Sequence, residues 1–158
     1  MPNVRWIILS TTVIIADQLT KSLAELYLTP LHSISIFPFL DLTLRYNTGA
    51  AFSLLHNAGG WQRYLFITIT CIALIILYRW LLSLSTTEKL LSVGLSLIIG
   101  GAIGNLIDRI ITGEVIDFIS VHYMMWYWPA FNIADTAISI GISLLLLDSV
   151  LTKPETNS

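Results

Sequence analysis

The sequence predicts an all-α membrane protein, with four transmembrane helices and a small extracytoplasmic β-containing cradle, as one integral-membrane domain over residues 1–158. Of the 158 residues, 55% are hydrophobic and only 11% are charged, and the mean hydropathy of +0.78 is too apolar for a soluble domain of this size. Four stretches also reach the roughly 20 apolar residues that a helix needs to cross a hydrocarbon layer of about 30 Å. Between them, two longer segments alternate in polarity, as strands do.

The predicted spans cover approximately residues 6–28, 61–83, 90–111 and 132–151. The first span follows Arg5 and has some features of a signal peptide. However, Asp17 and Lys21 lie inside it and no convincing small-residue cleavage site follows, so we expect this span to be retained. The connection between the second and third spans, SLSTTE, is short and polar.

The first long loop, residues 29–60, has the pattern of short strands. Ile34 and Ile36 precede an alternation of Leu40, Leu42 and Leu44 with Asp41, Thr43 and Arg45. A period of two places apolar and polar side chains on opposite faces of a strand. Pro38 interrupts the run, and Gly49, Gly59 and Gly60 mark turns. We therefore expect a small sheet in this loop.

The second long loop, residues 112–131, repeats this pattern with VIDFISV at 115–121. It continues into an aromatic belt suited to the headgroup layer, made of Tyr123, Trp126, Tyr127 and Trp128. Because both long loops follow odd-numbered spans, they should emerge on the same side of the membrane.

Basic residues near the ends of the spans bear on orientation. With the N-terminus inside, four lie at cytoplasmic ends and four at outer ends: Arg5, Arg79, Lys89 and Lys153 against Lys21, Arg45, Arg63 and Arg109. Lys21 and Arg109 lie beside acids of their own helices, and without these two the count is four against two. The sequence therefore favours cytoplasmic termini and external long loops.

Composition excludes several other kinds of function. The net charge is -2 and no run is rich in Lys or Arg, so neither nucleic acid nor a polybasic lipid-binding patch is indicated. The single cysteine, Cys71, cannot form an intrachain disulfide, and we expect it to be buried and inert. His32, His56 and His122 are isolated and no HExxH motif occurs, so we predict neither a metal site nor a cofactor.

Ionisable residues inside the spans need an explanation, because a charge at the bilayer centre costs about 2.5–3.5 kcal/mol. In the first span, Asp17, Lys21 and Glu25 recur every four residues and share one helical face, with Gln18 beside them. We interpret this face chiefly as an intrahelical ion pair that lets a polar surface pack inside the bundle, in preference to direct chemistry. It could also shape a pocket for the polar backbone of a substrate.

The third span ends in the segment GGAIGNLIDR. Gly100 and Gly104 form a GxxxG pair, which permits the close approach of another helix. Asn105 can hydrogen-bond a neighbouring helix or a peptide substrate. For Asp108 and Arg109 we favour a local ion pair that fixes the end of the helix.

Asp117 and Asp135 differ from the other acids because neither has a basic partner in register. Asn132 is a suitable N-cap for the fourth span, and Asp135 then occupies the third helical position, where it can complete a capping box and gain from the helix dipole. That explains Asp135 alone. It leaves Asp117, flanked by Ile116 and Phe118, with nothing obvious to neutralise it.

A pair of carboxylates accounts for both residues. Two carboxylates that meet in a partly desolvated site cannot easily ionise together, so the pair should hold one shared proton. The ionised member can deprotonate water while the protonated member hydrogen-bonds a substrate carbonyl, which is the chemistry of aspartic peptide hydrolysis. The helix N-terminus favours Asp135 as the ionised member.

Five motifs occur in order among the four spans: DQLTK (17–21), NTGAAFS (47–53), GGAIGNLIDR (100–109), VIDF (115–118) and PAFNIAD (129–135). In this combination the chain closely resembles lipoprotein signal peptidase, the bacterial signal peptidase II, over nearly its whole length. The resemblance implies an aspartic endopeptidase of the bacterial plasma (inner) membrane, with its active site toward the outer face. It would remove the signal peptide from prolipoproteins by cutting before a diacylglyceryl-modified cysteine.

The resemblance also implies roles for individual residues. Asp117 and Asp135 would be the catalytic pair. The residues around the site would be Asn47, Gly49, Asn105, Asp108, Arg109 and Asn132, with Asp17 and Lys21 supporting it from the first span. The first loop would form a sheet-like cradle with a mobile segment over the site. Prolipoprotein signal peptides and membrane lipids would be the partners, and we expect a monomer.

Three alternatives remain open. A small transporter or proton carrier could line a path with Asp17, Asp108 and Asp135, but the polar residues gather toward one side and no internal repeat is evident. A scaffold could use its buried acids only to hold helices together. A serine–lysine peptidase could use Lys21, but Ser22 lies at a different angle on the helix and no GxSxG motif occurs.

Overall fold

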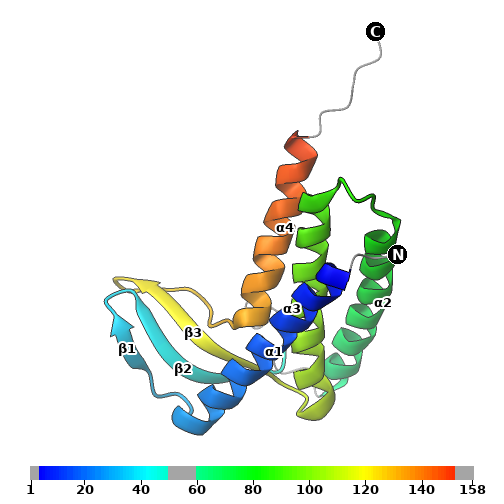
Figure 1. Cartoon of the computed structure of the whole chain (residues 1–158). Helices are drawn as coiled ribbons and strands as arrows, with labels where there is room; N and C mark the ends of the chain where they lie inside the picture. The colour runs from blue at the N-terminus through cyan, green and yellow to red at the C-terminus, as the bar shows by residue number, and fades with distance from the viewer. Residues whose placement is uncertain (1–3, 50–59, 152–158) are drawn as a thin grey trace.

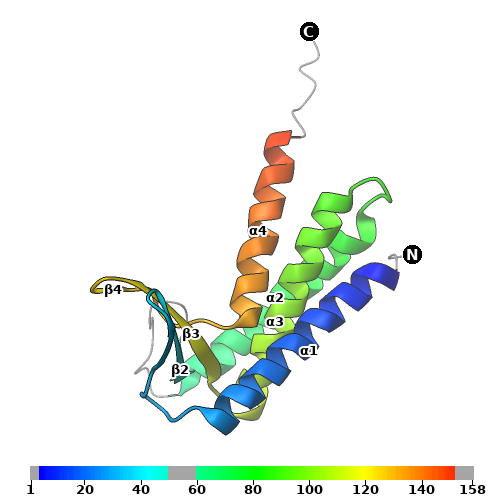
Figure 2. The same ribbon diagram turned by 60° about the vertical axis from the view of Figure 1, so that its left-hand side comes forward.

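The computed structural model describes residues 4–49 and 60–151. Within these residues lie the helices α1 (Val4–Tyr27), α2 (Trp61–Ser83), α3 (Lys89–Ile111) and α4 (Ile133–Leu151), and the strands β1 (Ile34–Phe37), β2 (Leu40–Asn47), β3 (Val115–Tyr123) and β4 (Trp126–Tyr127). Figure 1 shows the helices side by side, with the sheet at the end of the bundle where α4 begins. Seen from a second direction, the sheet extends sideways from this end (Figure 2).

The four helices are long and apolar enough to cross a membrane. Their bounds lie within two residues of the predicted spans. This agreement has a physical cause, because the thickness of the hydrocarbon layer fixes the length of an apolar helix and polar residues mark its ends. The predicted fold class, a membrane helical core with a small β-containing part, is confirmed.

Helix α3 lies at the centre of the bundle and contacts each of the other three helices. Glycines make two of these contacts close. A Cβ atom at Gly100 would lie 2.8 Å from the carbonyl oxygen of Ser10 in α1, and one at Gly101 would collide with the carbonyl oxygen of Ala134 in α4. The close approach of another helix that the GxxxG pair predicts is therefore confirmed at Gly100.

Helix α2 lies at the edge of the bundle and buries little of its surface. Cys71, which we expect from the sequence to be buried, is exposed on this helix. The expectation is wrong because the apolar run around Cys71 faces outward, where lipid would surround it, and not into a protein core.

The strands form one antiparallel sheet in the order β1-β2-β3-β4. The pairing of β2 with β3 joins the two long loops at one end of the bundle. Strand β4, which the sequence presented as an aromatic belt and not as a strand, folds back on β3 through a turn at Met124, where φ is 52°.

A register shift in β2 changes which residues share a face. Leu42 pairs with Ile119 and Arg45 pairs with Asp117, so β2 carries one residue more than β3 between these points. Thr43 and Leu44 are consecutive, yet both are buried. The strict alternation predicted for this strand is therefore wrong after Leu42, and the bulge brings Arg45 opposite Asp117.

A small hydrophobic core fixes the sheet onto α1. Leu44, Ile116 and Phe118 pack together with Ala24 of α1. Because successive side chains of a strand point to opposite faces, burying Ile116 and Phe118 directs Asp117 to the other face of the sheet. The apolar neighbours that leave Asp117 without a partner in the sequence are thus the residues that orient it.

Candidate active site

Asn132 is fully buried immediately before the first residue of α4. Its Oδ1 accepts a hydrogen bond from the Asp135 backbone N–H at 2.9 Å, and its own backbone N–H donates to Asp135 Oδ2 at 3.3 Å. These reciprocal bonds form the predicted capping box. Asn132 Nδ2 also donates to Asp117 Oδ1 at 2.8 Å, so the residue that caps α4 contacts both acids.

Asp117 lies in β3 with only 4% of its surface exposed. Besides Asn132, Asn47 of β2 donates from Nδ2 to Asp117 Oδ2 at 3.1 Å. Burial, and after it the charge of Asp135, raises the pKa of Asp117 to about 7, although both amides favour the ionised form. Asp117 can therefore hold a proton near neutral pH.

Asp135 lies in the first turn of α4 and receives donors from two directions. Asn105 of α3 donates from Nδ2 to Asp135 Oδ1 at 2.8 Å, while the Asn132 backbone N–H reaches Oδ2. The N-terminal end of a helix also attracts negative charge. Asp135 and Asp117 therefore each accept two hydrogen bonds. Only Asp135 also lies at the N-terminal end of a helix.

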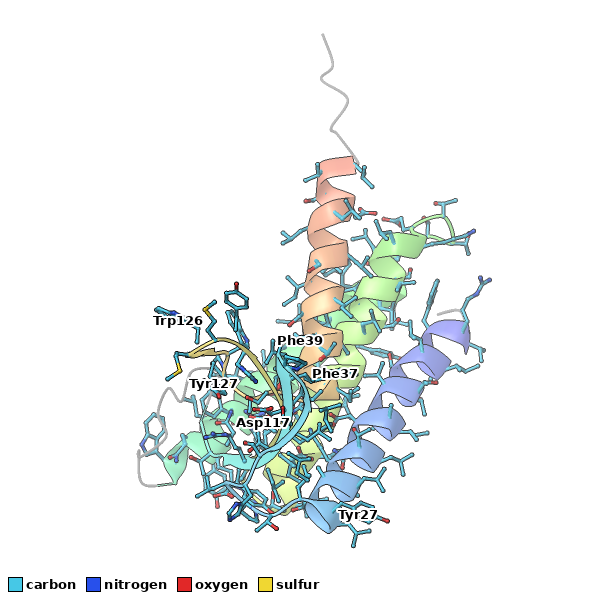
Figure 3. The ribbon with its side chains drawn as sticks, turned by 90° about the vertical axis from the view of Figure 1, so that its left-hand side faces the viewer. Tyr27, Phe37, Phe39, Asp117, Trp126 and Tyr127 are labelled. Carbon is cyan, nitrogen blue, oxygen red and sulfur yellow. The ribbon has the colours of Figure 1, made fainter. Side chains whose placement is uncertain are left out.

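The two acids line one cavity of about 1310 Å³ between the sheet and the start of α4. Its polar lining includes Arg45, Asn47, Asn105, Arg109, Ser120, Thr136 and Ser139, and its apolar lining includes Leu44, Tyr127, Trp128, Phe131, Ile138 and Ile140. Figure 3 views the molecule from this side, with Asp117 where the sheet meets the bundle and Trp126 at the far end of the sheet. A peptide segment in this cavity could meet both carboxylates at one bond.

Lys21 of α1 lies behind this cavity and is only 1% exposed. Its ammonium group contacts three acceptors, at 2.7 Å from Asp17 Oδ2, 2.6 Å from Asp108 Oδ2 and 2.9 Å from Asn105 Oδ1. The predicted intrahelical ion pair is confirmed, and it extends across to α3. The predicted pairing of Asp108 with Arg109 is wrong: adjacent helical residues point about 100° apart, so Asp108 faces α1 and bonds Lys21.

Arg109 instead reaches toward the end of β2. Its Nη2 donates to the Gly49 carbonyl at 3.2 Å, and its guanidinium carbon lies 5.2 Å from the ring centroid of Phe66. The Gly49 N–H donates in turn to Asn47 Oδ1 at 3.0 Å. Arg109 therefore ties the segment that carries Asn47 to α3.

Asp17 is fully buried and joins the first helix to the last. Its Oδ1 accepts a hydrogen bond from the Ala134 N–H at 2.9 Å. The first N–H groups of a helix have no partner within the helix, so Asp17 satisfies one of these donors in α4. It thereby fixes the turn that carries Asp135.

The ten residues predicted for the site divide into two groups. Those that line the cavity are Asn47, Asn105, Arg109, Asp117 and Asp135, and those that lie behind or beside it are Asp17, Lys21, Gly49, Asp108 and Asn132. Residues 50–53 of the NTGAAFS motif, and the segment expected to be mobile over the site, lie outside the described residues.

Two further residues near the site are not among the ten predicted site residues. Gln18 donates from Nε2 to Asp108 Oδ1 at 2.8 Å and to the Gly104 carbonyl at 3.2 Å. The sequence analysis places Gln18 beside the polar face of the first span but gives it no part in the site. Arg45 lines the cavity only because of the bulge in β2, and nothing in the sequence marks that bulge.

Comparison with known proteins is consistent with this geometry. A family model described as "Signal peptidase (SPase) II" matches residues 9–151. The lipoprotein signal peptidase of Ectopseudomonas mendocina is 48% identical over 145 residues, which cover 90% of this chain and 86% of that protein. The lipoprotein signal peptidase of Coxiella burnetii (strain Dugway 5J108-111) is 48% identical over 147 residues, covering 93% and 90%. These names give the transporter interpretation no support.

Solved structures extend the likeness to the fold. A bacterial membrane enzyme determined by the in meso method at 2.3 Å resolution matches with a TM-score of 0.83 and 34% sequence identity, covering 98% of this chain and 94% of that chain. A second such structure, at 1.9 Å resolution, gives a TM-score of 0.81 at 34% identity, covering 95% and 94%. Sequence, fold and site geometry agree, and the chain belongs to the signal peptidase II family.

Proposed function

We propose that this protein removes signal peptides from bacterial prolipoproteins by aspartic catalysis, cutting on the N-terminal side of a diacylglyceryl-modified cysteine. Membership of the family and the names of its relatives support the reaction. The observation that carries the aspartic mechanism is that Asn132 hydrogen-bonds both Asp117 and Asp135, two acids that line one cavity. Two carboxylates that can share a proton supply both a base and an acid.

In the proposed mechanism, Asp135 begins as the carboxylate and Asp117 as the acid. Asp135 takes a proton from water as the water oxygen attacks the scissile carbonyl carbon, and Asp117 gives its proton to the carbonyl oxygen. In the second step Asp135 passes its proton to the leaving amine nitrogen while Asp117 takes one back from the tetrahedral intermediate. The C–N bond then breaks and both acids return to their starting forms.

The rest of the cavity suits the two parts of this substrate. A signal peptide must lose helical structure near the cleavage point, and its freed backbone groups need partners at that depth. Asn105 and Arg109 offer polar groups, while Tyr127, Trp128 and Ile138 offer an apolar wall for a lipidated residue. These features favour a lipidated peptide over a soluble one.

The proposed topology places both termini in the cytoplasm and the cavity toward the outer face of the plasma membrane. Four spans return the chain to the side where it started, and the count of basic residues favours a cytoplasmic start. Residues of β2, β3 and the start of α4 line the cavity. Figure 1 shows these strands at the end of the bundle where α4 begins, away from the C-terminal end of α4. We propose a monomer as the active form.

The test uses Asp117→Asn and Asp135→Asn separately, each purified in detergent and given a lipidated prolipoprotein. Each variant should lose at least about 100-fold in cleavage rate, the smaller effect expected for losing one proton transfer. Each should still unfold cooperatively, because an amide replaces a carboxyl group of the same shape. Asp148→Asn, in α4 at the end away from the sheet, is the matched control and should cleave normally. Undiminished cleavage by either site variant would refute the mechanism, and misfolding of both would favour the scaffold interpretation.

A further inference from the structure

The ammonium group of Lys21 has no unused hydrogen. Lysine carries three donors and no acceptor, and Lys21 contacts three acceptors in a site that is almost closed to solvent. Two of these acceptors, on Asp17 and Asp108, are carboxylates. The third, Asn105 Oδ1, belongs to a neutral amide, and this contact links the buried ion cluster to the proposed catalytic pair.

The direction of the Asn105 amide follows from this contact. Its Oδ1 accepts from Lys21 at 2.9 Å and from Asn132 Nδ2 at 3.2 Å, so its Nδ2 is left to donate to Asp135 Oδ1 at 2.8 Å. A flipped amide would place its NH₂ group against an ammonium and a second amide NH₂, and its oxygen against a carboxylate. All three contacts would then be repulsive, so Lys21, together with Asn132 and Asp135, holds the amide in one orientation.

We propose that Lys21 is a positioning residue that acts through Asn105: it holds the amide as a donor to Asp135, which favours the charged form of Asp135 that receives the proton from water. The inference rests on the proposed function. Asn105 is the intermediary, and the role of Lys21 is to set its orientation.

The charge of Lys21 acts directly on both acids, so by itself it does not decide which of them is ionised. Lys21 lies between Asp17 and Asp108, and these three side chains carry one positive and two negative charges, a net charge of -1. The field of the whole cluster therefore opposes a second negative charge at Asp135. Arg45 of β2 and Arg109 of α3 line the same cavity as the pair, and Arg109 interacts electrostatically with both acids. The Asn105 amide and the N-terminal end of α4 act on Asp135, whereas Asp117 accepts from the amides of Asn47 and Asn132.

A double-mutant cycle on Lys21→Met and Asn105→Ala tests the pathway. Each single variant should move the acid limb of the pH profile of kcat upward by about one to two pH units, the 10- to 100-fold change in proton affinity expected from losing a hydrogen bond to a charged group. KM should change little. In the double variant the limb should move by less than the sum of the two single shifts, because the positioning effect of Lys21 passes through that amide. Additive shifts, or no shift in Lys21→Met, would overturn the proposal.

Two further variants distinguish an effect on the orientation of the Asn105 amide from an effect on the net charge of the cluster or on the stability of the protein. Lys21→Met with Asp108→Asn keeps the net charge of the cluster at -1, so the acid limb should remain displaced; a return to the wild-type profile would overturn the proposal. Gln18→Leu removes donors to Asp17 and Asp108 but none to Asn105, so it should lower stability without moving the limb. These outcomes are independent of the test on Asp117 and Asp135, whose failure would instead remove the proposed function.

Discussion

Amides, and not basic side chains, are the direct partners of both acids. Asn132 Nδ2 lies within hydrogen-bond distance of three acceptors, Asn105 Oδ1, the Ile116 carbonyl oxygen and Asp117 Oδ1. An ammonium at this place would hold both acids ionised, whereas a neutral donor leaves room for one proton. The chemistry of the site therefore depends on the proton affinity of Asp117, which burial determines more than any partner.

The free energy of unfolding should depend on pH because Asp117 binds a proton in the folded protein. The pKa of Asp117 is raised to about 7 in the folded protein, against an ordinary value near 4 in the unfolded chain. A group raised in this way contributes stability that is fully present below about pH 4 and is lost as the pH rises through about 7. Asp117→Asn removes the titration, so the free energy of unfolding of the variant should rise relative to wild type by up to about 3 kcal/mol from about pH 5 to about pH 8.

Chemical unfolding in detergent at these two pH values measures the difference. The replacement amide faces the donors of Asn47 and Asn132, which adds a constant offset without a pH trend. If the difference between wild type and variant instead stayed constant over this range, Asp117 would be ionised in both the folded and the unfolded protein.

Among the helices and strands, some features follow from the sequence and others cannot. Helix spans and the capping box are predicted well, because lipid thickness and local hydrogen bonds decide them within a few residues. The partner of Asp108 cannot be predicted in this way. Whether Asp108 pairs with Arg109 beside it or with Lys21 on another helix depends on how α1 and α3 pack. The bulge that moves Arg45 to the cavity depends on pairing between β2 and β3, which local alternation does not contain.

The close packing of α3 gives a prediction for two of its glycines. A Cβ at Gly104 would lie 2.5 Å from Asp17 Oδ2, and a Cβ at Gly94 would lie 2.9 Å from the Gly141 carbonyl oxygen, in the half of the bundle away from the site. Gly104→Ala and Gly94→Ala should each lower the free energy of unfolding by about 1–3 kcal/mol, as overpacking does. Only Gly104→Ala should also reduce cleavage per folded molecule, because it displaces the side chain that holds Ala134.

Thermal unfolding and prolipoprotein cleavage, compared at a temperature where both variants remain folded, separate the two effects. Equal losses of activity in the two variants would mean that general loosening of the bundle, and not the contact between Asp17 and α4, governs the site.

For the molecule as a whole, the sheet carries an unusually apolar outer end. Residues 123–128, here called the sheet tip, contain no charged residue, and Met125 and Trp126 are 88% and 80% exposed. Figure 3 shows Trp126 on the side of Asp117 that faces the C-terminal end of α4, whereas Tyr27 lies on the opposite side. Since the axis of α4 marks the direction across the membrane, the sheet tip should lie deeper than Asp117, among lipid headgroups and the first acyl carbons.

Fluorescence quenching in lipid bilayers tests this depth. A variant that keeps Trp126 and has the other four tryptophans replaced by Phe should be quenched by lipids brominated near the headgroup and poorly by iodide in water. The matched control places the single tryptophan at Tyr27→Trp, which should show the reverse. Quenching of Trp126 by iodide alone would place the sheet tip in water.

The hydrogen bond between Asp17 and Ala134 spans 117 positions of the chain. During synthesis on a ribosome, α1 is made long before α4. Asp17 therefore has no Ala134 N–H to bind until most of the chain has been made. The turn carrying Asp135 is fixed only when that late helix arrives. A polypeptide that lacks α4 therefore lacks both Asp135 and the contact between Asp17 and Ala134, and we expect it to be proteolytically inactive.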